Sequence, residues 1–326
     1  MKQGICTLGN DIVYDQLVAL LNSIDTILGS ETPVCIYPFD DQLEKIKAEV
    51  EKRPNVFIYE DTDSIQRWDE FMAVASPASV KRNYRIYGGH RRFCAFDGPF
   101  DRFVYLDADT LVMNSLDRVF DALENYDCVT YDFQHLDPKM IYNVESPLLF
   151  KVFSPEQVRL EIFCSGFFAS KKGLFPSQQR EWLLSQLKNS ESEILYPTGD
   201  QPVLNYIFMR SKLPIYNLAH HLPNSEKTGN SVTSSHFEAQ DHILYDKGKR
   251  LTYLHYIGIA PRVMQAVCRG ENIEFPYRDI FLHYRYLHKP EKRPVFTSPG
   301  VPYNYSPKPS LFKRVLRKLK LLSKKS

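Results

Sequence analysis

Two aspartates stand two residues apart in the sequence FVYLDADTLV, which spans residues 103–112. Side chains alternate between the faces of a β-strand, so a strand through both would hold the carboxylates of Asp107 and Asp109 side by side. Their repulsion raises at least one pKa unless a positive charge lies between them. Paired carboxylates at the end of a strand suit a hard divalent cation, Mn²⁺ or Mg²⁺, which characteristically bridges to the phosphates of a substrate. The plainer alternative is that one acid caps the following helix or pairs with a Lys or Arg side chain.

The segments around this pair alternate between strand and helix patterns. Strands are predicted at residues 3–9, 33–39, 55–60, 102–106, 127–133 and 161–170, and helices at 11–28, 40–54, 78–92, 115–126, 176–188 and 197–211. This alternation is typical of parallel βαβ units, so we predict an α/β fold with a Rossmann-like, mostly parallel central sheet and flanking helices. In such sheets ligands bind at the carboxyl ends of the strands, where Asp107 and Asp109 lie.

The composition is that of an ordinary globular protein, with 43% hydrophobic and 25% charged residues among 326. A chain of this length forms two average domains or one large α/β domain. Its six cysteines include no CxxC pair and several lie in apolar segments, which predicts reduced core thiols and no structural zinc site. The sequence has no leading signal peptide and no apolar run of membrane-spanning length, so we expect a cytoplasmic protein.

The positive charges gather at the C-terminal end. Ten Lys and Arg residues and no acid follow Glu291, so the net charge of +2 divides into ten positive charges there and −8 over residues 1–291. Residues 310–326 place apolar side chains at helical spacing among basic ones, which is typical of an amphipathic helix on an anionic membrane surface. The proline-rich residues 290–309 would link this tail to the body. A disordered solubilising tail is the alternative, and the acidic body argues against a nucleic-acid binder.

The sequence VYLDADTLV resembles the DxD signature of nucleotide-sugar glycosyltransferases with the GT-A fold. Five further elements follow that family's order: TLGNDIVY (7–14), NYRIY (83–87), FCSGFFAS (163–170), GDQPVLN (199–205) and LHYIG (254–258). The resemblance covers about residues 4–260 and is greatest to glycosyltransferase family 8, the retaining UDP-sugar enzymes that include glycogenin-like and bacterial lipooligosaccharide galactosyltransferases. It implies a glycosyltransferase domain over residues 1–289, with a nucleotide-binding half at about 1–135 and a half for the donor and acceptor sugars at about 136–289.

The resemblance also assigns roles to individual residues. It implies that Mn²⁺ or Mg²⁺ is held by Asp107, Asp109 and His255 and stabilises the charge that grows on the leaving diphosphate of a UDP-sugar. The implied nucleotide-binding residues are Thr7, Leu8, Asn10, Tyr14, Arg85, Asp107, Ala108, Gly258 and Arg262, with the Tyr14 ring available to stack on the base. The implied donor-sugar residues are Asp132, Cys164, Ser165, Asp200 and Gln201, of which Asp200 and Gln201 are the catalytic candidates. The expected acceptor is a glycan or a lipid-linked sugar, and the family transfers sugars with retention of the anomeric configuration.

Two positions depart from the family pattern, and simpler roles stay open for others. Cys164 stands where the family usually has Asn, and Arg262 follows the HxxG element one position later than the family's lysine. In these simpler roles, His255 is a histidine of the core and Asp132 is a residue of a turn. The sequence TGDQ (198–201) then only caps the following helix. Two other functions also stay open: a nucleotidyltransferase, and a catalytically inactive module that binds a sugar nucleotide or a glycan. The segment TLGNDIVY disfavours the first, because it has one glycine and no lysine for a phosphate-binding loop.

Overall fold

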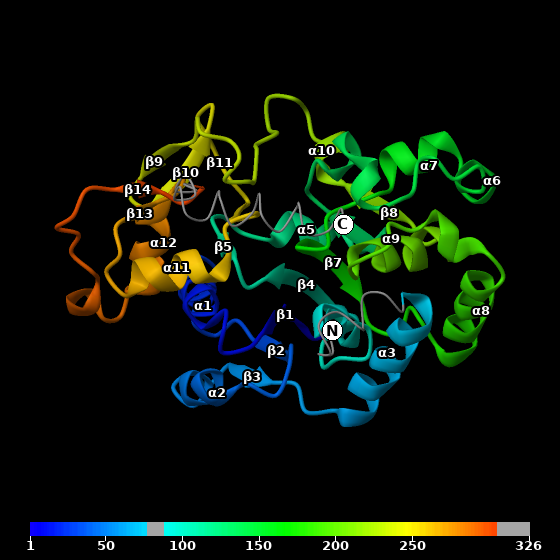
Figure 1. Ribbon diagram of the computed structural model, residues 1–326, viewed down its shortest axis with the longest axis horizontal. Coiled ribbons are helices and arrows are strands. Elements are labelled where there is room, and N and C mark those ends of the chain that lie inside the picture. Colours follow the sequence, from blue (N-terminus) through cyan, green and yellow to red (C-terminus); the bar gives the residue numbers. More distant parts are fainter. Residues whose placement is uncertain (77–87, 305–326) are drawn as a thin grey trace, which may run out of the picture.

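The computed structural model describes residues 1–76 and 88–304, so Arg85 and the predicted membrane tail lie outside the described residues. A seven-stranded sheet forms the centre, with the strand order β3-β2-β1-β4-β7-β6-β8 (Figure 1). Its strands are β1 (Gln3–Gly9), β2 (Val34–Pro38), β3 (Val56–Ile58), β4 (Arg102–Asp107), β6 (Cys128–Thr130), β7 (Phe167–Lys171) and β8 (Ile215–Asn217). β7 runs antiparallel to β4 and β6, and the other neighbouring pairs are parallel. The predicted α/β fold with a mostly parallel sheet is confirmed.

Helices cover both faces of this sheet. The α-helices are α1 (Tyr14–Leu28), α2 (Glu44–Val50), α3 (Thr62–Ala75), α5 (Asp117–Ala122), α6 (Leu149–Val152), α7 (Pro155–Leu160), α8 (Ser177–Lys188), α9 (Gln201–Arg210), α10 (Leu218–His221), α11 (Pro261–Cys268) and α12 (Arg278–Arg285). The 3₁₀ helices are η2 (Gly88–Phe96), η3 (Gln134–Leu136), η4 (Pro138–Met140), η5 (Glu191–Ile194) and η6 (Pro290–Lys292). Neighbouring strand residues point to opposite faces: Cys6 and Tyr105 pack in the core that includes α3 and α8, whereas Ile5 and Val104 pack in the core that includes α1.

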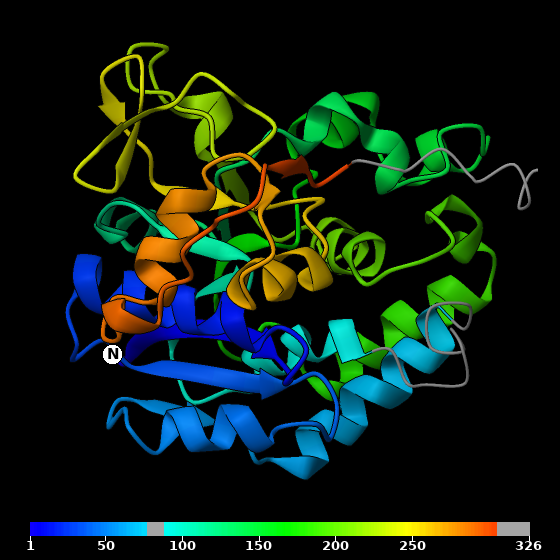
Figure 2. The same ribbon diagram turned by 60° about the vertical axis from the view of Figure 1, so that its left-hand side comes forward.

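Three small sheets complete the fold. β5 (Thr110–Val112) pairs with β12 (Tyr253–His255), β9 (Glu238–Gln240) and β11 (Lys249–Arg250) pair with β10 (Ile243–Asp246), and β13 (Ile273–Glu274) pairs with β14 (Val301–Pro302). Figure 2 shows the orange α12 beside the blue α1, where Arg285 pairs with Asp15 at 2.7 Å. The described part of the predicted linker (290–304) includes β14 and therefore lies against β13. Among the described helices, none has the length and apolar character needed to cross a bilayer.

The helix predicted over residues 11–28 begins later than expected, at Tyr14. The Asn10 side chain accepts a hydrogen bond of 3.1 Å from the Ile12 backbone N–H, and this bond holds a turn where the sequence pattern suggested helix. All six cysteines are free thiols, as predicted, and four of them are buried.

Further segments differ from their predicted secondary structure: α3 forms over Thr62–Ala75, where no helix was predicted, and two other segments near the acidic pair also differ. The strand predicted over residues 161–170 is regular only from Phe167, where β7 begins, and the FCSG residues before it form a turn. The helix predicted over 78–92 is described only from Gly88, where the chain forms the 3₁₀ helix η2. Both irregular segments lie next to the end of β4, where the acidic pair is found.

Candidate functional site

The three side chains predicted as metal ligands converge at the carboxyl end of β4. Asp107 is the last residue of β4, Asp109 lies in the turn before β5, and His255 ends β12, the partner of β5. Thr110 Oγ1 donates to the Asp107 carbonyl oxygen at 2.7 Å, and the Tyr256 N–H donates to the Asp109 carbonyl oxygen at 2.9 Å. One ligand atom from each of the three side chains lies within 4.8 Å of those of the other two.

This donor set fits a divalent cation. Two carboxylates and one imidazole are ordinary ligands for Mn²⁺, and carboxylates also suit Mg²⁺. Gly166 leaves room for the metal ligands because it has no side chain. A Cβ at this position would lie 2.5 Å from Cε1 of His255 and 2.9 Å from Oδ2 of Asp107. Any larger residue at this position of the FCSG segment would displace the ligands, so the glycine is part of the site.

The charges of these groups depend on one another. Burial, opposed by the Arg92 charge and reinforced by Asp109, raises the pKa of Asp107. Burial acts on Asp109 in the same direction, but the charge of His255 and its hydrogen bond outweigh it and lower the Asp109 pKa. Burial disfavours the imidazolium of His255, yet Asp109, 3.3 Å away, outweighs it and raises the His255 pKa well above its usual value. Asp107 and Asp109 thus stabilise a positive charge beside them, which is the proton of His255 here and would be supplied by a divalent cation when one is bound.

Arg92 is a site residue that the sequence reasoning missed. It lies on η2, is 6% exposed, and its Nη1 is 3.0 Å from Oδ1 of Asp107 while its Nε is 2.6 Å from Oδ2 of Asp200. Nη1 also donates to the carbonyl oxygen of Ser165 at 2.7 Å. The guanidinium lies 4.8 Å from the centre of the Tyr105 ring, whose hydroxyl donates to Asp107 at 2.9 Å. One buried arginine therefore joins the acidic pair to the GDQ segment.

Two cavities meet at Arg92 and Asp107. The first, of about 480 Å³, has a mainly apolar wall that includes Leu8, Ile12, Val13, Phe39, Ala108 and Pro261. The second, of about 390 Å³, has a mainly polar wall that includes Ser165, Tyr196, Thr198, Asp200 and Gln201. A molecule with an apolar end, a charged middle and a polar end matches this order of surfaces.

No protein-family model matches this chain, and no curated protein matches it. Among solved structures, WbbM, a bifunctional glycosyltransferase, matches with a TM-score of 0.51 at 13% identity over 90% of this chain and 52% of the WbbM chain. This chain thus spans about half the length of WbbM. The galactosyltransferase LgtC, in complex with donor and acceptor sugar analogues, matches with a TM-score of 0.50 at 13% identity, over 78% of this chain and 87% of LgtC. The chain has the GT-A fold.

On this GT-A fold, Asp200 and Gln201 lie in the wall of the polar cavity, at the start of α9. Asp200 occupies the N-cap position but its side chain makes no capping hydrogen bond; its carboxylate pairs with Arg92 instead. The backbone N–H of Ser165 donates to Oε1 of Gln201 at 3.0 Å, and Nε2 of Gln201 donates to Gln134 at 3.3 Å. The GDQ segment therefore supplies oriented polar groups, and the predicted alternative of a helix cap does not describe Asp200.

Asp132 and Cys164 are not among the described wall residues of the polar cavity. The Asp132 carboxylate accepts from Thr130 Oγ1 at 2.6 Å and from the Gln134 N–H at 2.7 Å, and burial raises its pKa to about 6. This geometry is that of the alternative role, a turn residue after β6. The Cys164 sulfur accepts from the Gly166 N–H at 3.5 Å, within the turn that approaches the acidic pair.

Some of the residues predicted to bind the nucleotide line the first, apolar cavity, and others do not. Leu8, Asn10 and Ala108 line this cavity, and Thr7 is buried in β1 next to Leu8. Tyr14 does not join them among the described wall residues: its hydroxyl donates to Glu49 at 3.3 Å and the Arg285 guanidinium lies over its ring. Val13, the residue just before α1, lies in the cavity wall instead.

Gly258 lies before α11 and Arg262 is its second residue, and neither is among the described wall residues of the same cavity. Gly258 has a φ of 83°, in the left-handed region that favours glycine, so the turn after His255 requires this residue type. Pro261 lines the cavity, whereas Arg262 is exposed and forms no ion pair with any described residue. The predicted phosphate contact of Arg262 therefore stays a prediction.

Proposed function

We propose that this chain is a metal-dependent glycosyltransferase that moves a hexose from a UDP-sugar to a glycan or lipid-linked acceptor. The observation that supports this most strongly is the position of Asp107 and Arg92 at the junction of an apolar and a polar cavity. The uridine, diphosphate and hexose of a UDP-sugar follow each other in the same order as the apolar wall, the charged groups and the polar wall. The likeness of the fold to LgtC, described in complex with donor and acceptor sugar analogues, is in keeping with this assignment.

In this proposal the reaction breaks the bond between the anomeric carbon and the diphosphate oxygen. A divalent cation held by Asp107, Asp109 and His255 would supply positive charge for the leaving diphosphate. Asp200, in the polar wall, would accept a hydrogen bond from a sugar hydroxyl, and Gln201, oriented by Ser165, would face the reacting carbon. Such fixed polar groups stabilise a transition state because they need no reorganisation when the charge develops.

Retention of the anomeric configuration is part of the proposal. Asp107 and Asp200 are the carboxylates among the described residues of the polar wall, and both pair with Arg92. A carboxylate paired with a buried guanidinium is a weak nucleophile, so a covalent glycosyl–carboxylate intermediate is disfavoured. The polar wall is thus compatible with the retaining route of family 8, in which no strong nucleophile faces the donor sugar, and the choice of retention itself rests on the family resemblance.

The proposal also includes the organisation of the chain and its place in the cell. Residues 1–135 would bind the nucleotide, residues 136–289 would bind the two sugars, and 290–309 would lead to the tail. The basic amphipathic tail (310–326) would hold the enzyme at the anionic cytoplasmic face of a membrane, close to a lipid-linked acceptor.

The decisive experiment measures UDP release from a panel of UDP-sugars, with and without Mn²⁺. We expect Mn²⁺-dependent release from one sugar by the wild-type chain and at least a hundredfold loss in Asp109→Ala, since each ~1.4 kcal/mol of lost transition-state stabilisation lowers the rate tenfold. Asp121→Ala is the matched control, because Asp121 is exposed on α5, outside both cavity walls, and we expect it to retain full activity.

Two outcomes would count against the proposal. If every donor stays intact and calorimetry detects no Mn²⁺-dependent binding of UDP, the chain is not a UDP-sugar transferase. If UDP-sugars bind tightly but no acceptor produces turnover, the alternative of an inactive sugar-nucleotide binding module is supported instead.

A further inference from the structure

A third cavity, of about 620 Å³, is separate from the two described above. It shares no described wall residue with either of them. Its wall comes from the segment after β5, from α5, from α10 and the loop that follows it, and from β11. A cavity of this size accommodates a small organic molecule or the head of a larger one.

The charges of this wall are opposite in balance to those of the other two cavities. The apolar and the polar cavity each combine one arginine with two aspartates, which a bound cation would neutralise. The wall of the third cavity contains three bases, Arg118, Lys249 and Arg250, and Glu226 is the acid among its described residues. Residues 1–291 carry a net charge of −8, so this local excess of positive charge runs against the rest of the body. It indicates an anionic ligand.

Arg250 keeps hydrogen-bond donors for such a ligand. Its Nε donates to the carbonyl oxygen of Met113, which fixes the orientation of the guanidinium. Arg250 is only partly buried, and its Nη1 and Nη2 are neither enclosed nor bonded to any group within residues 1–76 and 88–304. The neighbouring Lys249 is exposed and forms no ion pair with a described residue. Both side chains are therefore accessible to a molecule in the cavity.

The third base is paired with the acid of the same wall. Nη1 of Arg118 lies 2.8 Å from Oε2 of Glu226, and the two side chains are 60% and 43% exposed. Such an exposed pair is weak, so it does not prevent an anion from approaching the guanidinium. With Arg118 and Glu226 cancelling each other, Lys249 and Arg250 leave the wall with an excess of two positive charges.

The same cavity also has an apolar part. Val119, Leu218 and Tyr131 belong to its wall and are buried. The hydroxyl of Tyr131 accepts a hydrogen bond of 2.6 Å from the Thr228 N–H, so this polar group is already engaged. The wall therefore offers two accessible cationic groups next to apolar surface.

We propose that this cavity is a second binding site, specific for a phosphate monoester, whose phosphate is held by Lys249 and Arg250. A phosphate monoester carries about −1.5 to −2 charges at neutral pH, which the excess of two positive charges neutralises. Arginine binds two phosphate oxygens at once through parallel N–H donors. The inference goes beyond the proposed function and does not depend on it, because the cavity shares no described wall residue with the candidate transferase site.

Calorimetry with three probes tests the site: dihexanoyl phosphatidic acid, inorganic phosphate and dihexanoyl phosphatidylcholine. The first lipid ends in a phosphate monoester, and the second has the same chains but no net charge. EDTA in the buffer keeps divalent cations away from Asp107 and Asp109, where they would bind phosphate themselves. We expect the full wild-type chain to bind the phosphatidic acid at least tenfold more tightly than the phosphatidylcholine.

The variant Lys249→Met/Arg250→Met removes both proposed ligands, and we expect it to bind the phosphatidic acid at least tenfold more weakly than wild type. Lys188→Met/Arg159→Met is the matched control: it removes the same two charges from exposed positions on α8 and α7, outside the cavity wall. This control should bind as wild type does. The basic residues after position 304 are present in every chain, so their attraction for phosphate cancels in the comparison.

Thermal unfolding checks that the variants fold, because Arg250→Met also removes the bond to the Met113 carbonyl oxygen. Lys249→Glu is a second variant without this difficulty, since Lys249 is exposed and bonds to no described side chain. It places a negative charge beside the phosphate, so we expect it to weaken binding of the phosphatidic acid by at least tenfold as well.

The outcomes decide both the site and the source of its phosphate. If the variants of Lys249 and Arg250 lose affinity and the control does not, the site is supported. In that case, tighter binding of the phosphatidic acid than of inorganic phosphate assigns a lipid headgroup, and equal binding assigns a soluble phosphate. Equal weakening in the variant and its control, or equal binding of the two lipids by the wild type, overturns the site. None of these results bears on UDP release, so the transferase proposal stands or fails separately.

Discussion

At the scale of single residues, the positive charge of Arg92 compensates the negative charges of the carboxylates around it. It is 6% exposed and lies between two carboxylates, those of Asp107 and Asp200. Removing an arginine from such a position leaves an unpaired buried charge, which costs more free energy than the intact pair contributes. Asp200 is itself only 4% exposed, so it has little access to water that could replace the guanidinium.

We predict that Arg92→Met lowers the free energy of unfolding by about 3–5 kcal/mol, the usual cost of breaking a buried ion pair. Adding Asp200→Asn should recover part of this loss, because the second change removes one of the unpaired charges. Urea unfolding of the two single variants and the double variant measures the coupling. Arg91→Met is the control, since Arg91 pairs with Asp69 and its effect should add to that of Asp200→Asn. Additive effects of Arg92→Met and Asp200→Asn would contradict this role.

The site residues differ in how far the sequence could reveal them. The spacing of Asp107 and Asp109 predicts that their carboxylates lie together, whereas His255 was predicted to join them only through the family resemblance. Arg92 could not be chosen over other arginines before β4, because its reach depends on the 3₁₀ turn of η2, which no periodicity predicts.

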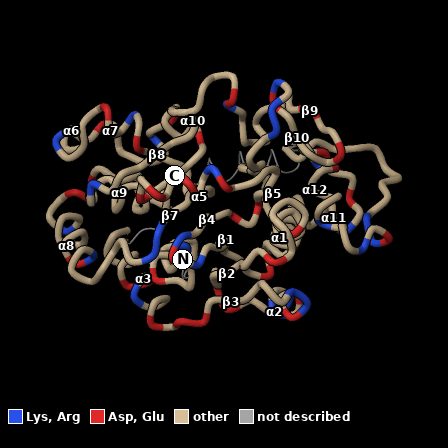
Figure 3. Tube along the Cα trace, turned by 180° about the vertical axis from the view of Figure 1, so that it is seen from behind, with Lys and Arg blue, Asp and Glu red and all other residues tan. Residues whose placement is uncertain are grey.

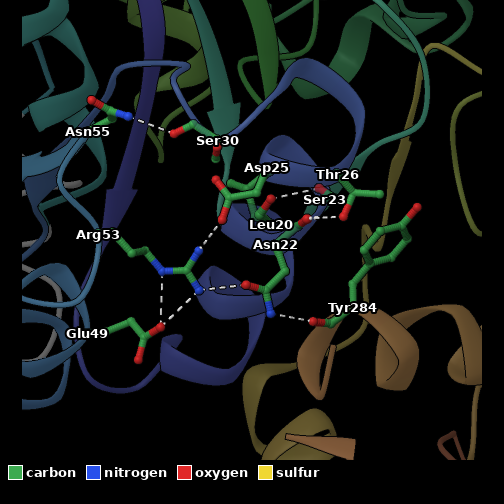
Figure 4. Close-up of polar contacts among 10 residues, drawn as sticks. All are labelled: Leu20, Asn22, Ser23, Asp25, Thr26, Ser30, Glu49, Arg53, Asn55 and Tyr284. Carbon is green, nitrogen blue, oxygen red and sulfur yellow. Dashed lines mark hydrogen bonds and ion pairs between the residues drawn. The ribbon is translucent and has the colours of Figure 1, made fainter. Parts of the chain in front are cut away.

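At the scale of elements, one arginine bonds to side chains of α1 and α2, and one of these side chains continues the network to α12 (Figure 4). Arg53, just after α2, donates from Nη1 to Asp25 at 2.7 Å and from Nη2 to Glu49 at 2.9 Å and to Asn22 at 2.6 Å. Asn22 in turn donates to the carbonyl oxygen of Tyr284 on α12 at 2.6 Å. Gln16, in the first turn of α1, is one of the wall residues of the apolar cavity, so this network holds a helix that contributes to that wall.

We predict that Arg53→Met destabilises the chain by about 2 kcal/mol, less than a fully buried pair because the Asp25 side chain keeps 25% exposure. Lys52→Met is a matched control: Lys52 also pairs with Glu49, but its side chain is 54% exposed, so the loss should stay below about 1 kcal/mol. Urea unfolding gives both values. Equal effects of the two substitutions would mean that the network around Arg53 adds nothing beyond an ordinary surface pair.

The elements themselves were largely predictable, and their ends were not. β1 and β2 are short apolar segments, each followed by a helix, so the alternating pattern predicted a mostly parallel sheet, although it did not predict α3 after β3. Side-chain hydrogen bonds moved the boundaries: the Asn10 turn delays α1, and the FCSG turn shortens β7. The reversed direction of β7 is a property of the whole topology, which no local pattern encodes.

At the scale of the whole molecule, charge is divided between the body and the tail. Figure 3 shows acidic and basic residues interspersed over the described elements, without separation onto two faces. The net charge of residues 1–291 is −8, whereas all ten charged side chains after Glu291 are positive. An acidic body is repelled by an anionic lipid surface, so any attraction to such a surface must come from the C-terminal segment.

We predict that the full chain binds vesicles that contain anionic lipid and that a chain ending at residue 304 does not. Eight Lys and Arg residues lie between positions 308 and 325, and each contributes about 1 kcal/mol near an anionic surface. Vesicle co-sedimentation measures this, and binding should weaken with salt because the Debye length falls from about 10 Å at 0.1 M to about 3 Å at 1 M.

A control variant that retains all charges separates the electrostatic attraction of the tail to the membrane from the insertion of its apolar side chains into the lipid. Replacing Leu316 and Leu319 by Ser leaves every basic residue in place but interrupts the apolar spacing of residues 310–322. Weaker binding by this variant, with unchanged UDP affinity, would mean that the apolar side chains enter the lipid interface. Equal binding by the full and shortened chains would instead place the membrane contact on the body, which its charge of −8 opposes. The tail then would have no part in bringing the site to a lipid-linked acceptor.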